Sequence, residues 1–155
     1  MDQVHWLSDE EQRAWRALAG VVMLLPSALD TQLQRDSQLT HFAYTVMAML
    51  SESPTRSARM SELAALANGS QSRLSHLVAR LEERGWVRRE RTPQDGRGYV
   101  AVLTDAGYEK VVESAPGHVG EVRRLVFDAL TPEQVARMEE VARAILAKVD
   151  EDETC

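Results

Sequence analysis

The stretch MSELAALANGSQSRLSHLVARLEERGWV, residues 60–87, decides the fold of this chain. Residues 60–67 have the apolar spacing of a short helix, and Asn68-Gly69 then supplies residue types that tolerate the left-handed backbone where a helix ends. Ser70 is a typical N-cap for a second helix over residues 70–84. One stripe of that helix is apolar, formed by Leu74, Leu77, Val78 and Leu81. Two helices joined by a tight turn predict a helix-turn-helix, whose second helix can enter the major groove of duplex DNA.

The hydrophobic period changes after Gly85. Residues 86–91 and 98–103 are short segments with β-branched and aromatic side chains, and the turn-forming residues 92–97 separate them. The pattern predicts a β-hairpin, and a hairpin directly after a recognition helix is the wing of a winged helix. Arg97 lies at the tip of this wing, where an arginine suits the narrow, electronegative minor groove.

Amphipathic helices are predicted on both sides of the winged helix. One runs from Ser8 to about Gln34, and a second runs from Thr40 to the segment 51–54. Beyond the hairpin, Thr104 caps a fifth helix, and a capping box over residues 131–134 begins the last one. The predicted fold class is mainly α with a small β-hairpin wing (α+β), in a single domain.

Two prolines fall inside predicted helices. Proline lacks an N–H and crowds the preceding turn, so Pro26 is expected to kink or divide the first helix. For the same reason Pro116-Gly117 is expected to break the fifth helix.

The distribution of charge favours a nucleic-acid partner although the whole chain carries −6. Residues 53–100 hold nine arginines against five acids, a net +4, so the remainder of the chain carries −10. Phosphate contacts need local positive charge rather than a high overall pI. A basic middle between acidic ends is typical of a DNA-reading module attached to a scaffold that does not bind DNA.

Other classes of protein find little support in the sequence. No apolar run approaches the length of a membrane span and the start of the chain lacks a secretory signal, so a cytoplasmic protein is expected. Cys155 is the single cysteine and has no metal-ligating cluster beside it, so no metal or cofactor is expected. The sequence contains no P-loop, HExxH or Gly-x-Ser-x-Gly motif, so the chain is not expected to be an enzyme.

Several of these segments together resemble the MarR (multiple antibiotic resistance regulator) family of transcriptional regulators. The resemblance is carried by residues 60–64, 72–78, 81–87, 95–98 and 103–107, in this order and at these separations. It implies a homodimer in which the first helix and the last two interlock with those of a second copy, so that two lobes straddle a pseudo-palindromic operator. The implied division is a winged-helix lobe over 39–104 and a helical dimerisation region over 8–36 and 105–150.

The implied function is that of a sequence-specific regulator of transcription, a repressor or, less often, an activator. Hydroxyl and amide groups on the second helix of the helix-turn-helix suit base edges and phosphates, while arginines supply charge. By analogy with the family, Asp95 steadies the wing and Arg97 reaches the minor groove, whereas His76 stands where relatives often carry arginine. The alternative is a winged-helix module that docks a protein without binding specific DNA. The candidate DNA-binding residues are Ser70, Gln71, Ser72, Arg73, Ser75, His76, Arg80, Arg89, Asp95 and Arg97.

The resemblance also implies release from DNA by a small effector. In the family, small aromatic or phenolic anions often bind near the first, second and fifth helices. Candidate contacts here are Trp15, His41, Tyr44 and Arg56, with Met23, Met47 and His118 as further candidates. Core packing of the aromatic residues and structural roles for the histidines are the alternatives.

Overall fold

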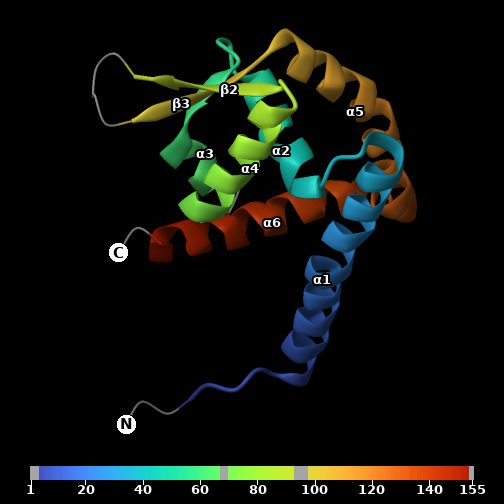
Figure 1. Ribbon diagram of the computed structural model, residues 1–155. Coiled ribbons are helices and arrows are strands. Elements are labelled where there is room, and N and C mark those ends of the chain that lie inside the picture. The colour runs from blue at the N-terminus through green and yellow to red at the C-terminus, as the bar shows by residue number, and fades with distance from the viewer. Residues whose placement is uncertain (1–3, 67–69, 93–97, 154–155) are drawn as a thin grey trace. The chain divides into compact units, whose positions relative to one another are not determined.

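A computed structural model describes residues 4–66, 70–92 and 98–153 of the chain. The chain divides into two compact units, residues 1–118 and 119–155. Figure 1 labels the α-helices and the strands β2 and β3. In order, the elements of the fold are α1 (Asp9–Ser37), α2 (His41–Glu52), β1 (Ser57–Arg59), α3 (Met60–Leu66), α4 (Gln71–Glu83), β2 (Val87–Arg91), β3 (Tyr99–Leu103), α5 (Asp105–Leu125), a 3-10 turn (Phe127–Ala129) and α6 (Pro132–Glu153).

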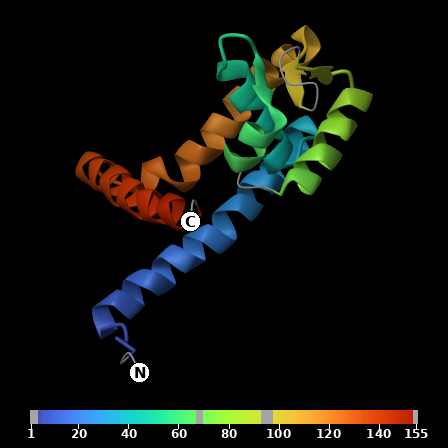
Figure 2. The same cartoon turned by 90° about the vertical axis from the view of Figure 1, so that its left-hand side faces the viewer.

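The first unit contains the predicted winged helix. Figures 1 and 2 show α2, α3 and α4 gathered beside the hairpin of β2 and β3, while the N-terminal half of α1 extends away from them. The sheet is antiparallel with strand order β1-β3-β2. The sequence predicted the hairpin but not β1, because a strand of three residues is too short to show a period of two.

The expected division of the first helix at Pro26 and the expected break of the fifth at Pro116-Gly117 are both wrong, because each helix continues through its proline. Pro26 lies inside the 29-residue α1, and Pro116 lies inside α5. A proline removes one backbone hydrogen bond, and the remaining hydrogen bonds of a long helix can outweigh that local cost. In α5 packing of the buried Val111 and Ser114 adds to these hydrogen bonds, and Gly117 permits a close approach to α1, since a Cβ there would lie 3.1 Å from Gln32 Nε2.

Local capping explains where the helices begin. Ser8 and Glu11 form a capping box at α1, and Thr131 and Gln134 exchange backbone-to-side-chain hydrogen bonds in the same way at α6. Thr104 Oγ1 accepts from the Gly107 amide at 3.0 Å at the start of α5. The capping box at 131–134 and the caps at Ser70 and Thr104 are as predicted. Ser8 is the N-cap that the sequence predicts, and the return hydrogen bond from the Ser8 amide to Glu11, which completes a capping box, was not predicted.

One hydrophobic core holds the winged helix together. It joins the C-terminal part of α1 to α2, α3, α4, the sheet and α5, and the predicted apolar stripe of α4 is buried in it. Gly107 lies so close to the sheet side of this core that an added Cβ would meet Trp86 O at 2.1 Å. The largest fully buried side chains are Leu33, Leu39, Val46, Met47, Leu50, Leu63, Leu74, Val78 and Val87.

Apolar side chains at the two ends of the chain are exposed instead. In α1 they include Trp15, Val22 and Met23, which is 75% exposed. In α6 they recur as Met138, Val141, Ile145, Leu146 and Val149, and no described side chain of α6 is buried. Across the described residues, no helix is both long and apolar enough to cross a membrane.

Candidate nucleic-acid interface

Helix α4, the second helix of the predicted helix-turn-helix, presents a polar face to solvent. Ser70 caps its N-terminus by accepting a hydrogen bond from the Arg73 amide at 3.1 Å, so the helix begins where the sequence predicts. Because the apolar stripe faces the core, the side chains between its members are exposed. All seven predicted DNA contacts in this segment are exposed, namely Ser70, Gln71, Ser72, Arg73, Ser75, His76 and Arg80.

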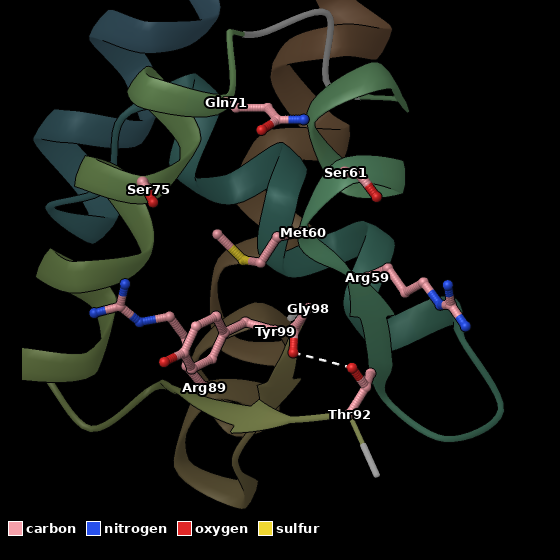
Figure 3. A pocket seen from close by; sticks show the side chains of 9 residues that line it. All are labelled: Arg59, Met60, Ser61, Gln71, Ser75, Arg89, Thr92, Gly98 and Tyr99. Carbon is pink, nitrogen blue, oxygen red and sulfur yellow. Dashed lines mark hydrogen bonds between the residues drawn. The ribbon is translucent and has the colours of Figure 1, made fainter. Parts of the chain in front are cut away.

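A concavity of about 540 Å³ lies between this helix and the base of the wing. Figure 3 shows side chains from α3, α4 and the hairpin around it. Thr92 closes its base through two hydrogen bonds to Gly98 O, from the backbone amide at 3.1 Å and from Oγ1 at 3.0 Å. The nine lining residues are Arg59, Met60, Ser61, Gln71, Ser75, Arg89, Thr92, Gly98 and Tyr99.

Three of the predicted contacts meet in this concavity, and the other lining residues were not named as candidates. Gln71, Ser75 and Arg89 line it together. Ser61 belongs to the motif at residues 60–64 but was not named as a contact, whereas no motif in the sequence marks Arg59 or Tyr99. Their contribution depends on the approach of β1 and β3, and β1 itself left no signal in the sequence. The predicted Asp95 and Arg97 lie outside the described residues.

The arginines of this region differ in how they are held. Arg89 is bound by Glu82, whose oxygens accept from its backbone amide and from its Nε, both at 2.8 Å. Arg73 stacks on the ring of Phe42 with 4.4 Å between the guanidinium carbon and the ring centroid. Arg88 pairs with Glu90 at 2.6 Å along its own strand. Aromatic or acidic neighbours therefore hold these three basic groups before any ligand binds.

The candidate effector residues do not all come together. His118 of α5 lies 4.5 Å from Tyr44 and 5.9 Å from His41, measured between ring centroids, so these three form one cluster. Arg56 contacts a different place, with its guanidinium 3.8 Å from the Tyr108 ring and 3.1 Å from Asp105. Trp15 and Met23 are exposed on α1, whereas Met47 is buried in the core.

The histidine cluster contains buried polar atoms without partners. Gln32, which is 3% exposed, donates a hydrogen bond from Nε2 to Asp36 at 3.0 Å. The Oε1 atom of Gln32 and the Nδ1 atom of His118 have no hydrogen-bond partner among the described residues. Such atoms cost free energy unless a ligand or water satisfies them. No group of three or more metal-ligating side chains occurs in the part of the chain that the structure describes.

Burial changes the pKa values of this cluster. Burial lowers the pKa of His118, and the nearby His41 lowers it further by charge repulsion. Burial also lowers the pKa of His41, against the opposing attraction of Asp30. Burial raises the pKa of the Tyr44 phenol, and Arg35 and Gln32 hold the pKa of Asp36 at about 2. The two imidazoles are therefore held neutral beside one another at neutral pH.

Solved structures of high sequence identity share this fold. Sco3205 of Streptomyces coelicolor, described as a MarR family transcriptional regulator in complex with DNA, is 51% identical, with 94% of this chain and 91% of that chain covered and a TM-score of 0.88. AbsC of the same organism, also described as a MarR family transcriptional regulator, is 40% identical, with 96% and 99% covered and a TM-score of 0.88.

The family model and a curated relative agree with these structures. Residues 37–98 match the model described as MarR family. The transcriptional repressor MprA of Escherichia coli K12 is 26% identical over 110 residues, which are 71% of this chain and 62% of that protein, so the match spans about three fifths of the repressor's length. The fold is that of winged-helix regulators. The chain belongs to the MarR family of transcriptional regulators, as the sequence motifs suggested.

Proposed function

We propose that this protein binds duplex DNA as a homodimer and represses transcription from a two-fold operator. The observation that carries the proposal is the exposed polar face of α4 beside the wing, with Gln71, Ser75 and Arg89 around one concavity. Amide and hydroxyl groups can exchange hydrogen bonds with base edges, and arginines bind phosphates. The relative Sco3205, described in complex with DNA, supports the same role for the shared fold.

Exposed apolar faces support the homodimer. On α6, residues 138, 141, 145 and 149 recur at helical spacing on one face and are exposed, as are several large apolar residues of α1. Patches of this kind mark interaction surfaces, because water is a poor solvent for them. A second copy, with the same apolar helices, supplies the matching surface that a two-fold interface requires.

Release by a small effector is the finer part of the proposal. The cluster of His41, Tyr44 and His118 offers aromatic faces, and the buried Oε1 of Gln32 offers an acceptor without a partner. A planar aromatic or phenolic molecule matches that chemistry, since its ring stacks and its hydroxyl donates. An effector that favours one arrangement of the lobes by about 1.4 kcal/mol would change DNA affinity about tenfold.

The experiment is a selection of DNA sites by the full-length chain from a randomised duplex library. Recovery of a two-fold motif, bound by two chains, is expected, with a steep loss of affinity as salt rises. A Gln71→Ala and Ser75→Ala double variant should lose the motif while Glu133→Ala, on α6, keeps it. A folded wild-type protein that selects no motif and shows no salt-dependent binding would favour the protein-docking alternative. Under the proposed role the protein works in the cytoplasm, where regulators meet chromosomal DNA.

A further inference from the structure

A single carboxylate fastens the wing to the recognition helix. Glu82 lies in the last turn of α4, and each of its two oxygens accepts one hydrogen bond from Arg89 of β2. One bond comes from the backbone amide and the other from Nε, both at 2.8 Å. The contact therefore fixes both the strand and the side chain of Arg89.

The backbone bond compensates for the position of β2 at the edge of the sheet. In the order β1-β3-β2, only β3 pairs with β2, so one side of β2 has no neighbouring strand. Amides on such an edge need a partner other than a strand. Glu82 supplies one for Arg89, and this makes the start of the wing part of the same rigid unit as α4.

The side-chain bond places a basic group beside the polar face of the helix. Gln71, Ser75 and Glu82 are spaced by four and seven residues, so they lie along one face of α4, and the first two line the concavity together with Arg89. Figure 3 shows the Arg89 guanidinium on the α4 side of that concavity. Glu82 and Arg89 are both partly exposed, at 29% and 36% of their side chains, so a ligand can reach the pair.

Arginine can serve a carboxylate and a phosphate at once. Its guanidinium has five N–H donors in a fixed fork, and the Glu82 contact takes the one on Nε. The donors on the two Nη atoms suit the oxygens of a phosphate. An arginine already held in place also loses less rotamer freedom when the phosphate binds.

We propose that Glu82 is a positioning residue that presents Arg89 to a backbone phosphate of DNA lying over the concavity. Glu82 itself touches no DNA and acts through Arg89. This inference rests on the proposed DNA binding, and it assigns to an acidic residue a supporting role that its sign of charge would not suggest.

The test is a double-mutant cycle on the full-length protein. Fluorescence anisotropy with a labelled duplex of about 30 base pairs, long enough for two half-sites a helical turn apart, gives the Kd at several salt concentrations. The variants are Glu82→Ala, Glu82→Gln, Arg89→Gln and the Glu82→Ala, Arg89→Gln double variant. Glu83→Ala is the matched control, because Glu83 is the next residue of α4 and its side chain makes no hydrogen bond or ion pair within the described part of the chain.

The expected pattern separates positioning from a general structural effect. Arg89→Gln should weaken binding about tenfold and reduce the slope of log K against log salt by about one. Glu82→Ala should weaken binding in the wild-type background and have a much smaller further effect in the Arg89→Gln background, where only its bond to the backbone amide of residue 89 is left to lose. Glu82→Gln, which can still accept from the Arg89 amide, should fall between Glu82→Ala and wild type, while Glu83→Ala stays within about twofold of wild type.

Two results would overturn the inference while leaving DNA binding intact. One is an unchanged Kd for Glu82→Ala. The other is a double variant in which the two losses multiply, since Glu82 would then act without Arg89. Thermal melting of each variant confirms that the folded protein is compared. A wild-type protein that binds no duplex would remove the proposed function itself.

Discussion

The winged helix buries most of its large apolar side chains, whereas the terminal helices leave many of theirs exposed. In the winged helix, Leu50, Leu63 and Leu74 are fully buried in a core built from α1, α2, α3, α4 and the sheet. In α6, which belongs to the other compact unit, Val141 and Leu146 are exposed by 57% and 59%. The first region is complete within one chain. The second carries an apolar face that a single chain leaves in water, which is the expected signature of a region completed by assembly.

Truncation of a core leucine should have the largest effect on stability. Leu50→Ala removes three heavy atoms from a fully buried side chain and leaves a cavity that the neighbours fill only in part, so a loss of about 2–5 kcal/mol in the free energy of unfolding is expected. Urea denaturation measures it. The comparison is Leu146→Ala, whose cost should grow with protein concentration, because the contacts that it removes belong to the assembled state. Equal, concentration-independent losses at the two positions would erase the distinction between the regions.

A pair of glycines gives a second, smaller contrast. An alanine at Gly107 would place its Cβ against Trp86 O, so Gly107→Ala should cost about 1–3 kcal/mol. Gly120 has no atom within 4 Å of a built Cβ and lies in α5, so Gly120→Ala should stabilise the helix by up to about 1 kcal/mol. Melting temperatures of the two variants test this. A stable Gly107→Ala protein would mean that β2 and α5 are less tightly joined than the structure has them.

These contrasts also separate what the sequence could predict from what it could not. The apolar stripe of α4, the Ser70 cap and the hairpin all follow from periods and residue types that lie close together in the chain. The continuity of α1 through Pro26 could not be predicted in this way, because a proline costs one backbone hydrogen bond and the other hydrogen bonds of a 29-residue helix can outweigh that local cost.

In the candidate site, too, some features follow from the local sequence and others depend on the folded chain. The exposure of Gln71, Ser72 and Ser75 follows from their places between the members of a buried stripe. The role of Glu82 does not, because its partner Arg89 belongs to a strand that packs on the helix only in the folded protein. Likewise the sequence grouped Arg56 with Tyr44 and gave His118 as a further candidate, whereas the fold brings His118 to Tyr44 and places Arg56 on Tyr108.

Acid should weaken the junction of α1, α2 and α5 by a smaller amount. The lowered pKa of His118 means that the unfolded chain binds protons more readily than the folded one. The stability that depends on neutral His118 is therefore fully present above its ordinary pKa of about 6.5 and is lost as the pH falls through that value. His118→Gln should flatten the fall in melting temperature between about pH 7 and pH 5, and His5→Gln, at an exposed position, serves as the control. Identical pH profiles for wild type and His118→Gln would show that the imidazole is not held neutral in the folded protein.

The most direct test of the account asks whether the exposed face of α6 is needed to join two DNA-binding lobes. Sedimentation of the full-length protein, alone and with a selected duplex, would be compared for the wild type, an Ile145→Glu, Leu146→Glu variant and a Glu140→Ala control on the same helix. We expect two wild-type chains per duplex, a folded monomeric variant that binds the duplex far more weakly, and a control that behaves as the wild type. A variant that still pairs and binds the duplex as two chains, or a wild-type protein that binds as a single chain, would contradict this expectation.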